Sequence, residues 1–313
     1  MKNLVFLLGL LFGFWGIMAY SWGGEPMKVR LSALAGSWYP AEPEELKVMI
    51  KKYLDEAQVS EIKEAIFGLI VPHAGYQFSG KAAAFGFKAV RGKNFSRVIL
   101  IGPSHYAWFR GVCLSSFSFY ETPLGQVPVD RSVGEALSRK SIFSFNPTAE
   151  EKEHSLEIEL PFLQMVLKDF TIVPLIVGEL EEKDYQEVAK SLKPFITKET
   201  LVVVSSDFTH YGWRFNYLPF QENIKENLAK LDLGAVKMIL EKDFAGYQKY
   251  LKETGATICG KNPIGILLNL LSPDSEGKLL NYYTSGEIIN DYSSTVSYVS
   301  LIFIKKEEAL LKP

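Results

Sequence analysis

The sequence is poor in the residues on which disulfide-rich proteins and zinc fingers depend. Its 313 residues include only two cysteines, Cys113 and Cys259, and no C-x-x-C spacing. Two cysteines this far apart in the chain form no disulfide framework, although they could pair if the protein is exported. Histidine is also scarce, with four in the chain, which makes the surroundings of each one informative.

An excess of charge of either sign is also lacking. The 34 basic and 36 acidic residues give a net charge of −2, so there is no basic field to attract nucleic acid. Hydrophobic residues make up 47% of the chain, which is ample for a globular core. Residues 27–313 contain no repeat, linker or low-complexity segment, and we expect them to form one compact domain.

The first 26 residues differ from the rest. Lys2 gives a positive start, residues 4–18 are almost wholly apolar, and Ala19 and Ser21 are small residues at the two positions that a signal peptidase reads. We expect a signal peptide and a secreted or periplasmic protein. An uncleaved membrane anchor is one alternative, although the apolar run is short and broken by glycines. The other is a cytoplasmic protein that starts at Met27.

Short apolar runs rich in β-branched residues recur at residues 66–72, 97–103 and 201–204. Such runs are typical of strands buried on both faces, as in a parallel sheet. An alanine-rich segment, residues 81–90, has the length of a crossover helix between the first two runs. The pattern predicts an α/β fold with a mostly parallel or mixed sheet, whose ligands bind at the carboxyl ends of the strands.

Two of the histidines come directly after such runs. His73 follows the first run and is itself followed by Gly75, whereas His105 follows the second run. If the two strands are neighbours, they lie roughly 4.8 Å apart and both imidazoles can converge on one ion. A single histidine at a strand end is equally well a structural group, so the pair carries more weight than either residue.

The third run leads into two hydroxyls, a carboxylate and an imidazole, Ser205-Ser206-Asp207-Phe208-Thr209-His210. His210 is the natural general base here, and Asp207 would fix its tautomer or hold a water molecule. The alternative is that this segment only caps the next helix.

Cys259 is next to Gly260 and precedes Pro263, in a loop that we expect to enter a helix at its N-terminus. The helix dipole and Lys261 would lower the pKa of this thiol and favour the thiolate. The alternative is a buried, inert thiol. Two imidazoles and a thiolate suit iron, copper or zinc and argue against magnesium and calcium.

Three further residues are candidates for supporting roles. Trp38 belongs to a loop of small residues and aromatics, although it could equally fill the core. His154 and Glu157 are three residues apart, which places both on one side of an opening helical turn. Because four acidic residues surround His154, the alternative is a solvated helix start with a raised histidine pKa.

The chain resembles the Memo family, whose prokaryotic branch is called AmmeMemoRadiSam system protein B. The resemblance spans about residues 30–304. It rests on six stretches in the same order: residues 35–40, 71–76, 102–105, 153–162, 205–212 and 257–264. It implies a three-layer α/β/α fold related to class III extradiol dioxygenases, and partners of the AMME-domain and radical SAM types.

The resemblance also implies roles for individual residues. His73, His105 and Cys259 match the metal site of the family, and His210 matches the base of the dioxygenase relatives, with Asp207 beside it. Trp38 and Tyr76 match aromatic residues that line the same pocket. His154 and Glu157 belong to a family motif without a firm role.

Two departures limit what the resemblance implies. The dioxygenases hold iron with two histidines and a carboxylate, whereas this chain offers Cys259, so ring cleavage does not follow. Family members are also usually intracellular, unlike a protein with a signal peptide.

We expect a metal-dependent oxidoreductase with one ion, iron first and then copper or zinc, acting on a small aromatic molecule. The alternatives are a non-catalytic peptide- or partner-binding module and a zinc hydrolase.

Overall fold

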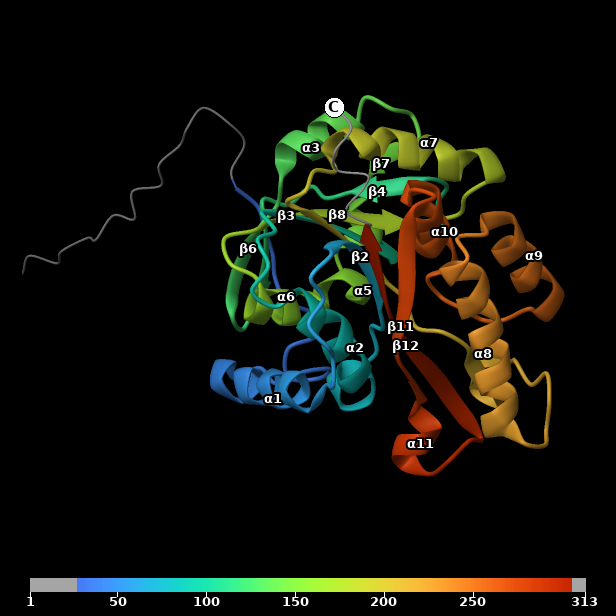
Figure 1. Ribbon diagram of the computed structural model, residues 1–313. Coiled ribbons are helices and arrows are strands. Elements are labelled where there is room, and N and C mark those ends of the chain that lie inside the picture. Colours follow the sequence, from blue (N-terminus) through green and yellow to red (C-terminus); the bar gives the residue numbers. More distant parts are fainter. Residues whose placement is uncertain (1–26, 306–313) are drawn as a thin grey trace, which may run out of the picture.

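The computed structural model describes residues 27–305, whose centre is a nine-stranded sheet (Figure 1). From edge to edge the strands are β10 (His210–Gly212), β12 (Ser294–Lys305), β2 (Ala65–Val71), β9 (Thr200–Ser205), β3 (Arg97–Pro103), β8 (Thr171–Val177), β4 (Val112–Leu114) and β7 (Phe143–Phe145), and β11 (Ser275–Thr284) pairs with β12. The four strands from β2 to β8 are parallel to one another. β12 is antiparallel to β2, and β4 is antiparallel to β8, so the sheet is mixed.

Helices cover both faces of this sheet, which confirms the predicted α/β/α architecture (Figure 1). One face packs on α1 (Pro43–Glu56), α2 (Tyr76–Val90) and α6 (Leu160–Val166), and the other on α3 (Arg131–Leu137), α7 (Glu182–Leu192), α8 (Ile224–Leu240), α9 (Phe244–Thr254) and α10 (Lys261–Leu270). Leu69 and Val71 of β2 point to the first layer and Ile70 to the second. All three are fully buried, which explains the uninterrupted apolar run.

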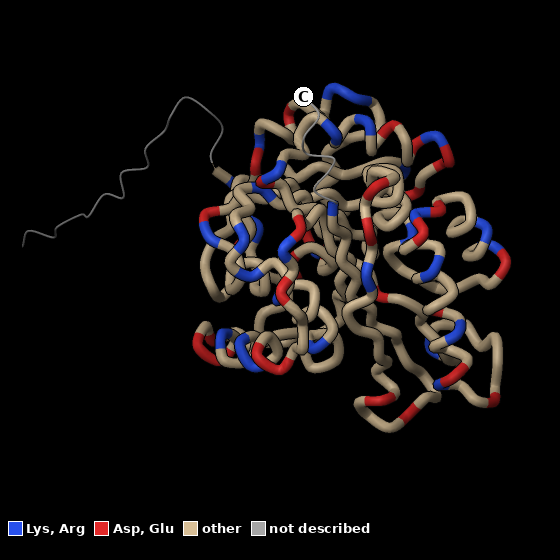
Figure 2. The backbone as a smooth tube through the Cα atoms, in the orientation of Figure 1, with Lys and Arg blue, Asp and Glu red and all other residues tan. Residues whose placement is uncertain are grey.

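Smaller elements complete the fold. A second sheet joins β1 (Val29–Arg30), β5 (Phe119–Thr122) and β6 (Gly125–Pro128), and the short helices are α4 (Pro147–Glu150), α5 (His154–Glu157) and α11 (Ser285–Ile289). Acidic and basic residues are interspersed along the backbone, without a large region of one charge (Figure 2). No helix within residues 27–305 is long and apolar enough to cross a membrane. The expected signal peptide or anchor, residues 1–26, lies outside the described part of the chain.

The order of the central strands corrects one expectation. β2 and β3, which lead to His73 and His105, are not neighbours, because β9 lies between them and pairs with both. β9 leads to Ser205, Asp207 and His210. Because β9 lies between β2 and β3, the carboxyl ends of three strands, rather than two, lie side by side at the same edge of the sheet.

Candidate metal centre

Three potential metal ligands converge at the carboxyl ends of the central strands. His73 follows β2, His105 follows β3, and Cys259 precedes α10. The ligand atoms of the three residues all lie within 4.8 Å of one another. The Sγ of Cys259 is 3.1 Å from the Nε2 of His73, and the centroids of the two imidazoles are 5.1 Å apart. Residues that are 186 positions apart in the chain thus form one cluster.

His73 is oriented by a chain of hydrogen bonds that runs into the core. Its Nδ1 is 2.8 Å from the Oγ of Ser205, which in turn donates to the Oε1 of Glu159 at 2.8 Å. When Ser205 donates its proton to Glu159, Nδ1 of His73 donates to Ser205, and this tautomer leaves the lone pair of Nε2 facing Cys259. Burial lowers the pKa of His73 well below its ordinary value, so the ring is neutral and able to ligate.

Glu159 was not singled out in the sequence. It is 1% exposed, and burial raises the pKa of its carboxyl well above the ordinary value. The one feature of the sequence that marks Glu159 is its position as an acidic residue in the apolar segment around Pro161. This feature does not indicate which residue Glu159 contacts.

His105 is held by a carboxylate. Glu153 accepts a hydrogen bond from the Nδ1 of His105 at 2.8 Å with one oxygen and from the His105 backbone N–H at 2.7 Å with the other. Burial raises the pKa of the Glu153 carboxyl, but the hydrogen bond and charge of His105 outweigh burial and leave this pKa below its ordinary value. Glu153 therefore fixes the ring with Nε2 directed away from it, as carboxylates do for metal-ligating histidines.

We expect Glu153→Gln to weaken metal binding by roughly 10- to 100-fold, the usual effect of losing such an outer contact. The amide would place an NH2 group against the backbone N–H of His105, so one of the two hydrogen bonds is lost. Competition with a chromogenic chelator measures the change. Glu151→Gln, on an exposed neighbour, is the matched control, and equal affinities of the two variants would contradict this role.

The pKa of the Cys259 thiol is raised, contrary to the low value that the sequence predicts. Its Sγ accepts a hydrogen bond from the backbone N–H of Asp207 at 3.2 Å. Burial, followed by the charge of Asp207, nevertheless raises the pKa of the thiol well above its ordinary value. Lys261 is exposed to solvent and does not compensate for the burial. A cation at this position would deprotonate the thiol, because a coordinated thiol loses its proton outright.

The donor set fits a late transition metal. Nitrogen and sulfur ligands around a tetrahedral ion stand roughly 3–4 Å apart, given bond lengths of about 2.0–2.3 Å. The distance of 3.1 Å between Sγ of Cys259 and Nε2 of His73 lies in this range, and all three ligand atoms lie within 4.8 Å of one another. A second group, which consists of His105, Glu153 and His154, also lies within 4.8 Å. It is the weaker candidate, because Glu153 already binds the Nδ1 of His105.

His210 has its free nitrogen available as a base. Its Nδ1 lies 3.0 Å from the carbonyl oxygen of Phe208 and 3.1 Å from that of Thr257. Carbonyls only accept, so Nδ1 carries the proton and Nε2 carries the lone pair. Burial lowers the pKa of His210, with a smaller contribution from the charge of His105. The ring is therefore neutral near pH 7.

Asp207 lies elsewhere than expected. Its Oδ1 accepts a hydrogen bond from the backbone N–H of His73 at 2.8 Å. The carbonyl groups described above, rather than Asp207, set the tautomer of His210. Burial raises the pKa of Asp207 to about 7, against the lowering effect of the backbone hydrogen bonds. Asp207 thus ties the turn after β9 to the turn after β2.

His154 joins the site as a stacked ring. Its centroid is 4.2 Å from that of His105, on which it stacks, and 4.7 Å from the ring of Trp38, so His154 contacts both a proposed ligand and Trp38. His154 is buried, and burial lowers its pKa to about 4. This result is opposite to the solvated, raised-pKa histidine that the acidic neighbours suggested. Trp38 remains partly exposed.

Tyr76 and Glu157 lie behind the site. Tyr76 is 2% exposed, and its hydroxyl donates to the carbonyl of Ile158 at 2.7 Å. This burial does not favour the expected contact with a substrate. Glu157 is fully buried, and its carboxylate binds the side chain of Arg30 at 2.6 Å. The same carboxylate accepts hydrogen bonds from the backbone N–H groups of Ala33 and Leu34, so it anchors the loop that carries Trp38.

Comparison with known proteins places the chain in a family. Residues 30–302 match the model of the Memo-like protein family. The chain is 35% identical to Protein memo-1 homolog of Caenorhabditis elegans over 288 residues, which cover 87% of this chain and 81% of that protein. It is 34% identical to Protein MEMO1 of Homo sapiens over 286 residues, which cover 87% of this chain and 96% of that protein.

Among solved structures, the uncharacterized protein JW3007 from Escherichia coli K12 matches with a TM-score of 0.50 and 14% identity, covering 76% of this chain and 99% of that one. At this identity the likeness shows a shared fold only. The family model and the relatives together cover nearly all of the described residues. The chain belongs to the Memo family.

Proposed function

We propose that the protein is a metal-dependent oxidoreductase that acts on a small aromatic molecule, with one ion held by His73, His105 and Cys259. The observation that carries the proposal is the convergence of these three ligand atoms within 4.8 Å. Iron is the first choice of metal, and copper or zinc also suits two imidazoles and a thiolate. The ion would supply Lewis acidity and, as iron or copper, one-electron chemistry.

The residues around the ligands suit a phenolic substrate. Nε2 of His210 is free to take the proton of a phenolic hydroxyl, which raises the electron density of the ring. The partly exposed ring of Trp38 offers a flat apolar surface for an aromatic ring. His210 itself packs against Phe215 at a centroid distance of 5.0 Å, which limits its movement.

His210→Gln tests this role. We expect the variant to keep its metal and to lose at least ~100-fold in the rate of oxygen uptake with catechol, because a general base contributes roughly that much or more. An oxygen electrode measures the rate on protein reconstituted with Fe(II). Arg214→Gln, at an exposed position four residues further along the chain, is the matched control. Equal rates in the two variants would exclude His210 as the base.

Two other functions have support from particular features. The ligand set with a neutral histidine nearby also suits a zinc hydrolase, for which ester cleavage would be unaffected by removal of oxygen. Tyr106 and Trp108 come directly after His105 and are 52% and 86% exposed, which favours a module that binds a peptide. If the protein is such a module, we expect it to bind a peptide without catalytic turnover, whether or not metal is present.

A further inference from the structure

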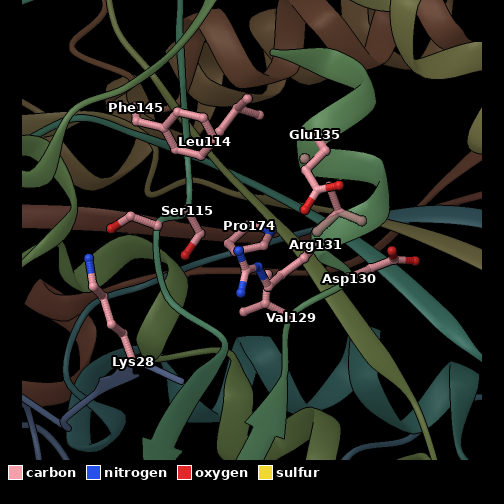
Figure 3. Close-up of a pocket in the computed structure, with 12 residues that line it drawn as sticks. Lys28, Leu114, Ser115, Val129, Asp130, Arg131, Glu135, Phe145 and Pro174 are labelled. Carbon is pink, nitrogen blue, oxygen red and sulfur yellow. The ribbon is translucent and has the colours of Figure 1, made fainter. Parts of the chain in front are cut away.

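A cavity of about 380 Å³ is lined by residues of β4, α3 and β8 and by Lys28, which precedes β1 (Figure 3). Part of its wall is apolar and comes from the end of β4, the segment before α3, and the middle of β8: Leu114, Val129, Val173 and Pro174. The half-exposed ring of Phe145 adds a further apolar surface. The cavity shares no residue with the metal centre, and its size is that of a site for a small molecule.

Two cationic side chains line the same cavity. Figure 3 shows the guanidinium of Arg131 directed towards the middle of the cavity, whereas Lys28 lies at the edge of the cavity with its ammonium directed away from Arg131. Among the ion pairs of residues 27–305, neither side chain has a carboxylate partner. Asp130 also lines the cavity, but Arg97 already binds its carboxylate at 2.7 Å. An anion that enters the cavity therefore meets two cations that have no partner within the described chain.

The geometry of Arg131 favours a carboxylate ligand. Glu135, which is exposed on α3, also lines the cavity, and the carboxylate of Glu150 lies behind Ser115 and Ser116. These two carboxylates balance Lys28 and Arg131, so the cavity has no excess of positive charge to attract a highly charged anion. A planar guanidinium matches the geometry of a carboxylate through two parallel hydrogen bonds.

The part of the cavity wall that contains two serines is fixed by a buried carboxylate. Ser115 and Ser116 line the cavity, and both hydroxyls donate to the carboxylate of Glu150. Glu150 is 1% exposed and also accepts from the Ser116 backbone N–H at 3.0 Å and from Tyr120 at 2.9 Å. Because these hydroxyl protons are already used, an anionic ligand would bind through the cations, and the wall would move little on binding.

From this combination we propose that the cavity binds a small organic monocarboxylate with an apolar body, such as an aromatic acid. The carboxylate pairs with Arg131, and the apolar body packs on Leu114, Val129 and Phe145. The site is independent of the metal chemistry proposed above, and a separate binding experiment tests it.

The test is titration calorimetry of the full-length protein with benzoate as the probe, beside acetate and inorganic phosphate. We expect saturable binding of benzoate, weaker binding of acetate because it lacks the apolar body, and weaker binding of phosphate. Arg131→Ala should weaken benzoate binding by roughly 10- to 100-fold, as expected for loss of a charged hydrogen-bonding partner. Arg139→Ala, which changes an exposed arginine outside the cavity lining, should leave it unchanged.

Three results would overturn the proposal. The first is no saturable binding of benzoate, and the second is phosphate binding as tight as that of benzoate. The third is benzoate binding that survives Arg131→Ala but is lost in His73→Ala, which would place the acid at the metal centre. Arg131 is exposed, so its replacement leaves the fold intact and a loss of binding reports on the cavity.

Discussion

Replacement of Arg30 by methionine is expected to lower the free energy of unfolding by ~3–5 kcal/mol, because it leaves a buried carboxylate without its cation. Arg30 is 2% exposed and pairs with Glu157, which is fully buried, at 2.6 Å. Its other nitrogens donate to the backbone carbonyls of Glu150 at 3.0 Å and Glu153 at 2.7 Å. Methionine fills much of the volume but restores none of these contacts.

Urea unfolding of the two proteins measures this difference. Lys47→Met is the matched control, since Lys47 forms an exposed ion pair with Glu44 and its loss should cost less than ~1 kcal/mol. The account of Arg30 fails if both variants lose similar stability. Because Arg30 binds the carbonyl of Glu153, the residue that orients His105, the variant should also bind metal more weakly.

Replacement of Cys259 by alanine is expected to abolish stoichiometric metal binding. The thiolate is the one anionic ligand in the proposed set, and two neutral imidazoles alone hold a divalent ion far less tightly. The loss should exceed the roughly 10- to 100-fold effect expected for Glu153→Gln, which acts only through His105. Chelator competition measures both variants on one scale.

Cys113→Ala is the control for Cys259→Ala. Cys113 is buried, at 1% exposure, and it lies in β4 among apolar side chains and outside the potential metal groups of the described residues. We expect it to bind metal as the parent does. If Cys259→Ala retains parental affinity, or if Cys113→Ala loses metal to the same extent, the thiol of Cys259 is not a ligand.

The central strands and the polar residues that follow them were predictable because each is recognised from neighbouring residues in the sequence. Residues 66–72 and 97–103 combine apolar side chains with an abrupt change to His73 and His105, and this pattern requires no knowledge of distant contacts. The same holds for residues 201–204 and the polar residues after them. The two layers of helices follow from these runs, since a strand that is apolar on both faces needs cover on both.

The order of the strands was not predictable in this way. β9 pairs with Gly68 of β2 and Val98 of β3 and so lies between these strands, although it follows even β3 by about a hundred residues. Pairing across such distances depends on the packing of the whole sheet. Consequently Ser205 reaches His73, and Asp207 binds the His73 backbone instead of His210.

The supporting carboxylates escaped prediction for a related reason. Glu153 and Glu159 resemble ordinary acidic residues of a helix surface, and only the folded chain buries them against His105 and Ser205. The thiol pKa of Cys259 was mispredicted because the helix N-terminus was recognisable in the sequence, whereas the depth of burial was not.

We propose that His73, His105 and Cys259 together hold one transition-metal ion. Elemental analysis of anaerobically purified protein, beside His73→Ala and Cys259→Ala, is the first experiment. We expect about one ion of iron or copper per chain in the parent and almost none in either variant. Zinc alone would support the ligands but favour the hydrolase. No metal in the parent after reconstitution, or full metal content in both variants, would contradict the claim.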